Sequence, residues 1–97
     1  MGQYDNQYTI KEILDQIEKK YRFTNQMNKE TVLASWHEIA GPMVAKYTKK
    51  IDIIDGRLIL EISDPSVKNE LQYLRENLID AVNKYMGKVV IEEVVIK

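Results

Sequence analysis

Few residues of this chain have the types and spacing that catalysis requires. His37 is its single histidine and cysteine is absent, so neither a two-histidine metal site nor a thiol nucleophile can be assembled. The adjacent carboxylates Glu92 and Glu93 would point to opposite faces of a strand and cannot work as a pair. The glycines stand apart, so none forms a phosphate-binding loop. The sequence predicts a non-enzymatic protein without a cofactor, a metal site or a small-molecule substrate.

A first cluster of cations could bind nucleic acid. Lys19, Lys20 and Arg22 are interleaved with Tyr21 and Phe23. Cations beside aromatic rings are what a stacking platform for single strands needs. The simpler interpretation is the C-terminal end of a helix, where the helix dipole favours cations.

A second cluster consists of Lys46, Lys49, Lys50 and Arg57, at the two ends of a predicted β-hairpin. Folding would gather these cations although the net charge of the chain is −1. We therefore expect weak, sequence-indifferent binding of single-stranded DNA that falls with added salt. Lysines that protect a solvated sheet edge explain the cluster about as well.

The hairpin is the strongest local signal in the chain. Asp55-Gly56 between two apolar runs is typical of a two-residue type I′ turn, which needs positive φ at both residues. This turn sets a register in which Ile53 faces Leu58 and Lys50 faces Glu61. The apolar residues of the two strands then share one face: Ile51, Ile53, Leu58 and Leu60.

A long amphipathic helix and a final strand should follow the hairpin. Asp64 is a good N-cap, Pro65 suits the first helical position and Gly87 is placed to end the helix. The apolar stripe between them is Val67, Leu71, Leu74, Leu78, Val82 and Tyr85. A strand is predicted over residues 88–96. Either alternation leaves one glutamate on its apolar side, which suits a strand at a sheet edge.

Two helices and a short third one are predicted ahead of the hairpin. Thr9 and Glu12 form a capping box, with Tyr8 and Ile13 as a hydrophobic staple. This first helix should end near Arg22, and its expected buried stripe is Ile10, Ile13, Leu14, Ile17 and Tyr21.

A polar connection is expected over residues 24–28, ahead of the second helix. That helix should begin near residue 28 and bury one face, on which Trp36 is predicted to be a core residue. Gly41 can take a left-handed cap, and Pro42 opens the short third helix.

These elements predict one α+β domain over residues 1–97, with residues 1–8 flexible. The order α-α-β-β-α-β gives a three-stranded sheet with helices packed on one face. No apolar run is long enough to span a membrane and no signal peptide is evident. A cytoplasmic protein without membrane contact is expected, since cysteine is also absent.

Five short motifs in order resemble the DciA-like family, long catalogued as a domain of unknown function. They are Trp36 to Gly41, Ala45 to Thr48, Asp55 to Leu58, Glu70-Leu71, and Asn83 with Gly87. The resemblance covers essentially the whole chain. It implies a fold similar to a type II KH domain and a role as a bacterial replicative-helicase loader or helper. It also implies that the helicase and single-stranded or tailed DNA are the partners.

Two features depart from the family and from KH domains. Val67 stands where family members often have tryptophan, and the chain has no Gly-x-x-Gly loop of the kind with which KH domains grip nucleic acid. The alternative function is therefore a protein–protein adaptor that binds no nucleic acid. A salt titration of DNA binding separates the two hypotheses.

Overall fold

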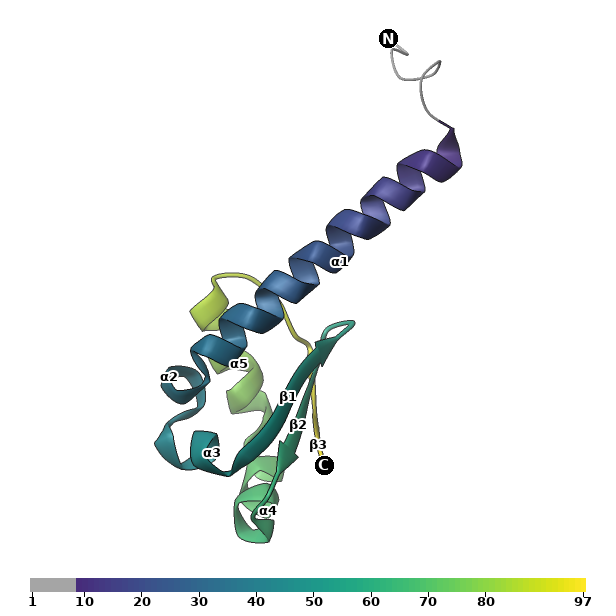
Figure 1. The fold of residues 1–97 in the computed structure, drawn as a ribbon. Helices are drawn as coiled ribbons and strands as arrows, with labels where there is room; N and C mark the ends of the chain where they lie inside the picture. The colour runs from purple at the N-terminus through teal and green to yellow at the C-terminus, as the bar shows by residue number, and fades with distance from the viewer. Residues whose placement is uncertain (1–8) are drawn as a thin grey trace.

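The computed structural model describes residues 9–97 and confirms the α+β class (Figure 1). The predicted flexibility of residues 1–8 and the staple contact of Tyr8 lie outside the described residues. In chain order the elements are α1 (Ile10–Ala34), α2 (Trp36–Ala40), α3 (Pro42–Tyr47), β1 (Thr48–Ile54), β2 (Arg57–Ile62), α4 (Pro65–Tyr73), α5 (Arg75–Met86) and β3 (Glu93–Ile96). No helix in the described part of the chain is long and apolar enough to cross a membrane.

The three strands form one mixed sheet in the order β1-β2-β3. β1 and β2 are antiparallel, and the predicted register is confirmed: Ile53 lies opposite Leu58, and Lys50 opposite Glu61. Asp55 and Gly56 both have positive φ, at 49° and 77°, as a type I′ turn requires. The turn sequence alone was therefore enough to place the strand residues from Lys50 to Glu61, and the register shifts only beyond them, between Thr48 and Lys50.

β3 is the parallel edge strand of the sheet, and it is shorter than predicted. It pairs with β2 so that Val94 lies beside Leu58 on the core side and Glu93 beside Arg57. The preceding residues form an irregular segment instead of extending the strand. The orientation that the alternation left open is thus settled by Val94, which is buried, while Glu93 is exposed.

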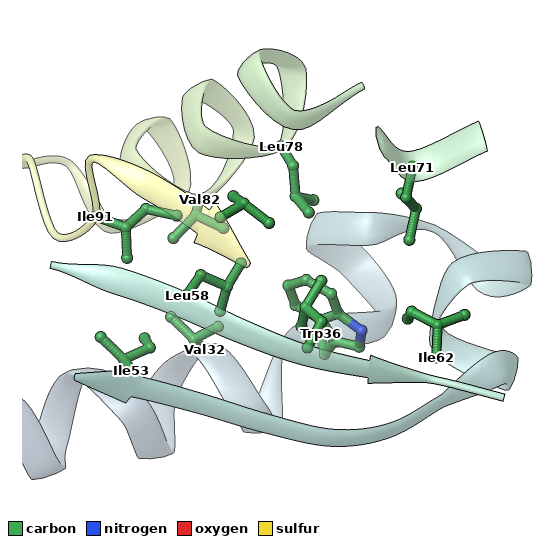
Figure 2. Close-up of a cluster of buried hydrophobic side chains, with 11 residues drawn as sticks. Val32, Trp36, Ile53, Leu58, Ile62, Leu71, Leu78, Val82 and Ile91 are labelled. Carbon is green, nitrogen blue, oxygen red and sulfur yellow. The ribbon is translucent and has the colours of Figure 1, made fainter. Parts of the chain in front are cut away.

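The core lies between one face of the sheet and the helices, as Figure 2 shows. Trp36 is buried there, as predicted, and its indole N–H donates to the Thr48 hydroxyl at 3.0 Å. That hydroxyl in turn donates to the Val44 carbonyl at 2.6 Å. The buried side chains are Val32, Trp36, Ile53, Leu58, Leu60, Ile62, Leu71, Leu78, Val82, Ile91 and Val94.

The prediction that the first helix ends near Arg22 is wrong, because α1 continues to Ala34. Residues 24–28 were expected to be a connection since they lack apolar side chains on a stripe. They contain neither proline nor glycine, however, so nothing interrupts the backbone ladder. Local contacts support this polar stretch: the Gln26 amide donates to Glu30 at 3.1 Å, and the Thr31 hydroxyl donates to the Met27 carbonyl at 3.0 Å.

The stripe expected to be buried along the first helix is exposed instead. The N-terminal half of α1 extends beyond the sheet and the other helices (Figure 1), in a molecule that measures 59 × 23 × 21 Å. The exposed residues are Ile10, Ile13, Leu14, Ile17 and Tyr21. The periodicity correctly predicted a helix, but within residues 9–97 this half of the helix has no surface to pack against.

The helices break at two places where neither proline nor glycine occurs. Ser35 separates α1 from α2, so the predicted second helix is reduced to Trp36–Ala40. Leu74 separates α4 from α5, so the predicted long helix is two helices between the confirmed caps Asp64 and Gly87. Gly41 has positive φ but ψ of 161°, which is not the left-handed cap expected.

Candidate nucleic-acid interface

Three of the predicted cations lie together where α3 meets β1. Lys46 is in the last turn of α3, and Lys49 and Lys50 begin β1. The register shifts between Thr48 and Lys50, so Lys49 is the extra residue of a β-bulge. Bulges occur at sheet edges and redirect a side chain. All three lysines are exposed, and together they are called the α3–β1 lysine cluster below.

The α3–β1 lysine cluster borders a hollow that could receive a flat group. The Lys46 ammonium lies 5.5 Å from the centroid of the Tyr47 ring, within cation–π range. Lys49 and Lys50 line a hollow of about 280 Å³, whose other lining residues are Leu33, Trp36, Ala45, Thr48 and Ile51. The arrangement combines positive charge with an apolar floor, which suits a phosphate backbone with a base or sugar beside it.

Arg57 is not part of this cluster. It begins β2 directly after the turn, opposite Ile54 in β1 and beside Glu93 in β3. Lys50 lies four residues from Ile54 along β1, which corresponds to about 13 Å. The predicted gathering therefore holds for three of the four cations, and the register places a carboxylate next to the fourth.

Lys19, Lys20 and Arg22 lie on the projecting half of α1 and are exposed. Since α1 continues past them, the interpretation as a helix C-terminus is wrong. Arg22 is paired with Glu18 one turn earlier. About 20 Å of helix separates Lys20 from Leu33, which borders the α3–β1 lysine cluster. The two predicted basic regions are therefore separate surfaces.

Lys29 is a cation that the sequence could not assign to the sheet. It projects from α1 and pairs with Asp52 of β1 at 3.1 Å. With Lys50 and Lys97 it lines a second hollow on the face of the sheet away from the core. The sequence predicted that a second helix begins near residue 28, which put Lys29 at the start of a helix, so no sequence signal placed it beside β1.

The family can now be compared with this geometry. The model of the family described as Dna[CI] antecedent, DciA, matches residues 9–96, which is nearly the whole described chain. The chain belongs to the DciA family. DciA proteins are non-enzymatic and act in helicase loading during bacterial DNA replication. No curated protein matches the chain.

The residues that carry the DciA resemblance hold the fold together. Trp36 and Thr48 hydrogen-bond to each other, and Gly56 completes the hairpin turn. The Asn83 side chain accepts from the Val90 and Ile91 N–H groups and donates to the Ile91 carbonyl, all within 3.0 Å. These motifs therefore explain much of the architecture, and the exposed side chains among and beside them are the candidates for partner binding.

Proposed function

We propose that this DciA protein binds the replicative helicase and that it contacts single-stranded or tailed DNA weakly through the α3–β1 lysine cluster. The observation that carries the proposal is the family match over residues 9–96. Its action is then in the bacterial cytoplasm, where the chromosome is replicated. A helicase loader must hold a protein ring near a single strand, so a weak contact with DNA beside a protein-binding surface suits the task.

The charge distribution supports weak and non-specific contact with DNA. The chain carries 14 cationic and 15 acidic side chains, so a general attraction to phosphate is absent. Binding must then come from local clusters such as Lys46, Lys49 and Lys50. Arg57, Lys19, Lys20 and Arg22 are secondary candidates, because they lie on other parts of the surface.

The DNA contact is tested with the variant in which Lys46, Lys49 and Lys50 are all changed to glutamate. We expect loss of single-stranded DNA binding at low salt, while the parent shows a negative salt dependence of about 0.7 per phosphate neutralised. Stability should hardly change, since exposed charges contribute little to folding. The matched control changes Arg75, Lys84 and Lys88 to glutamate, which alters the net charge equally at exposed positions.

The result distinguishes the loader hypothesis from the adaptor alternative. DNA binding that survives in the cluster variant, or that falls equally in the control, removes the α3–β1 lysine cluster as the site. A parent that binds the helicase in co-purification but no DNA at low salt is the protein–protein adaptor. Absence of helicase binding in the parent would contradict the proposal as a whole.

A further inference from the structure

The projecting half of α1 carries an apolar surface that no residue of the described range 9–97 covers. Ile10, Leu14, Ile17 and Tyr21 recur at spacings of four, three and four, and we call them the α1 stripe. Their exposed fractions are 77%, 58%, 59% and 52%. This spacing is that of the a and d positions of a heptad, the seam along which two helices pack. A stripe of this size on a monomer usually marks an interaction surface.

The α1 stripe is the continuation of the face by which α1 packs on its own domain. One turn at a time, that face runs from Tyr21 through the half-buried Asn25 and Asn28 to Val32, which is fully buried. Beyond Tyr21 the domain no longer covers it. A partner that packs on the α1 stripe would therefore lie on the same side of α1 as the domain. It would be next to the domain along the axis of α1, which Figure 1 shows.

An unsupported helix of this length gains from a partner. Isolated helices shorter than about 12–15 residues are marginal in water, and most helical stability in proteins comes from packing of an apolar face. In residues 10–20 the structure shows no buried side chain. The capping box at Thr9 begins the helix well, but it supplies no tertiary contact.

We propose that the α1 stripe is the docking site for a second copy of this chain, with the two α1 helices antiparallel. In that arrangement Ile10 packs beside Tyr21 of the second copy, and Leu14 beside Ile17. The pairing buries every residue of both stripes about one two-fold axis, as symmetric dimers do. The inference does not depend on the proposed DNA contact.

The geometry of the domain selects the antiparallel orientation. Each domain lies on the same face of α1 as its stripe, because that face ends in the buried Val32. Parallel helices would place both domains at one end, in the same space between the helices. Antiparallel helices place the domains at opposite ends, and each N-terminal half then lies beside the other.

The charges along the stripe fit the same register. Lys11 and Glu18 flank one side of the stripe, seven residues apart, at the heptad positions that face each other in antiparallel pairs. Lys11 of one copy then meets Glu18 of the other, and symmetry makes this contact twice. Within residues 9–97 Lys11 forms no ion pair, while Glu18 is paired only with Arg22 of its own helix. The second copy therefore supplies the partner that Lys11 lacks.

The interface is small, so self-association should be weak. The stripe spans residues 10–21, which is about 18 Å of helix. Stable protein interfaces bury about 1,600 Å² in total, more than a seam of this length offers. We expect the chain to be mainly monomeric in dilute solution and to dimerise reversibly as the concentration approaches millimolar.

Charge exchange tests both the dimer and its orientation by sedimentation equilibrium. Lys11→Glu places two glutamates opposite each other at both contacts, and Glu18→Lys places two lysines there. Each variant alone should dimerise at least about tenfold more weakly than the parent, because two attractive contacts become repulsive. An equimolar mixture of the two should recover dimerisation, since each contact then joins opposite charges. The control Lys19→Glu, on the opposite side of α1, should leave the constant unchanged.

Three results would overturn the inference. They are a parent that remains monomeric at millimolar concentration, a dimer whose constant the two exchanges do not move, and a mixture that associates no better than its components. The first would leave the α1 stripe for a different partner, such as a segment of the helicase. Circular dichroism before the measurement confirms that the variants are folded, which is expected because both positions are exposed.

Discussion

At the residue scale the hydrogen bond between Trp36 and Thr48 joins α2 to the first residue of β1. The indole is buried in the core, and its N–H would be left without a partner there if Thr48 were absent. The Thr48 hydroxyl in turn donates to the Val44 carbonyl within α3. This chain of donors fixes α2, α3 and β1 relative to one another.

We expect Trp36→Ala to lower the free energy of unfolding by about 3–5 kcal/mol, as large-to-small changes in a core do. Thr48→Val should cost about 1–3 kcal/mol, because it leaves the buried indole N–H unsatisfied. Trp36→Phe combined with Thr48→Val removes both partners and should cost less than the sum of Trp36→Phe alone and Thr48→Val alone. Denaturant unfolding of the four proteins gives the coupling. An alanine variant as stable as the parent that no longer binds the helicase would make Trp36 a recognition residue instead.

The turn at Asp55-Gly56 gives a second test at this scale. A Cβ built on Gly56 meets no atom within 4 Å, so strain from its φ of 77° is the sole penalty of a substitution. Gly56→Val should destabilise the protein by at least about 1–2 kcal/mol. Asp55→Asn is the matched control, since Asn-Gly forms the same turn. Equal thermal stability of the valine variant and the parent would contradict the argument from strain.

At the element scale Asn83 links the last helix to the last strand. Its side chain makes three hydrogen bonds to residues 90 and 91, in the irregular segment between α5 and β3. Ile91 is fully buried in the core, although it lies in no strand. The segment can therefore follow a tight path that no ladder of backbone hydrogen bonds supports.

Asn83→Ala should destabilise the protein by at least about 2 kcal/mol, because the N–H groups of Val90 and Ile91 lose their acceptor. Asn77→Ala, in the same helix at an exposed position, should have almost no effect. Hydrogen exchange of the residue 90 and 91 amides checks the mechanism. Their protection should fall in the first variant more than the protection of β1 does. Equal loss in both places would mean that Asn83 acts only through global stability.

The elements that the sequence predicted well are those with local signals. Asp55-Gly56 determined the register, while Asp64 and Gly87 marked the ends of a helical region. The breaks at Ser35 and Leu74 have no such local signal, since neither proline nor glycine occurs there. The continuation of α1 past Arg22 was missed because residues 24–28 are polar and carry no apolar stripe. The stripe ahead of them was predicted to be buried, but no part of the described chain covers it. The α3–β1 lysine cluster was predicted in part. The register of the hairpin separates Arg57 from Lys50, so three of the four predicted cations lie together.

At the scale of the whole molecule the chain consists of a packed domain and a projecting helix. The core side chains begin at Val32, and none of residues 10–20 is buried. The long axis of 59 Å reflects this extension. Stability and self-association are thus expected to reside in different parts of one chain.

Removal of residues 1–20 should change the free energy of unfolding of the dilute protein by no more than about 0.5 kcal/mol, as for changes at exposed surfaces. The long axis should shorten by about 16 Å, which small-angle scattering detects. Leu58→Ala, in the core, is the contrasting variant and should cost about 2–5 kcal/mol. A truncated chain that unfolds at a much lower temperature would show that the projecting half supports the domain.

The mixed sheet also has a consequence for the rate of folding. β2 pairs with β1 across a two-residue turn, but the connection from β2 to β3 is long and contains α4 and α5. Local contacts form early, whereas parallel pairing must first overcome the entropy of closing a long loop. We expect Ile53→Val to slow folding, and Val94→Ala mainly to speed unfolding. The central strand would then exist as half of a hairpin before it becomes the middle of a sheet.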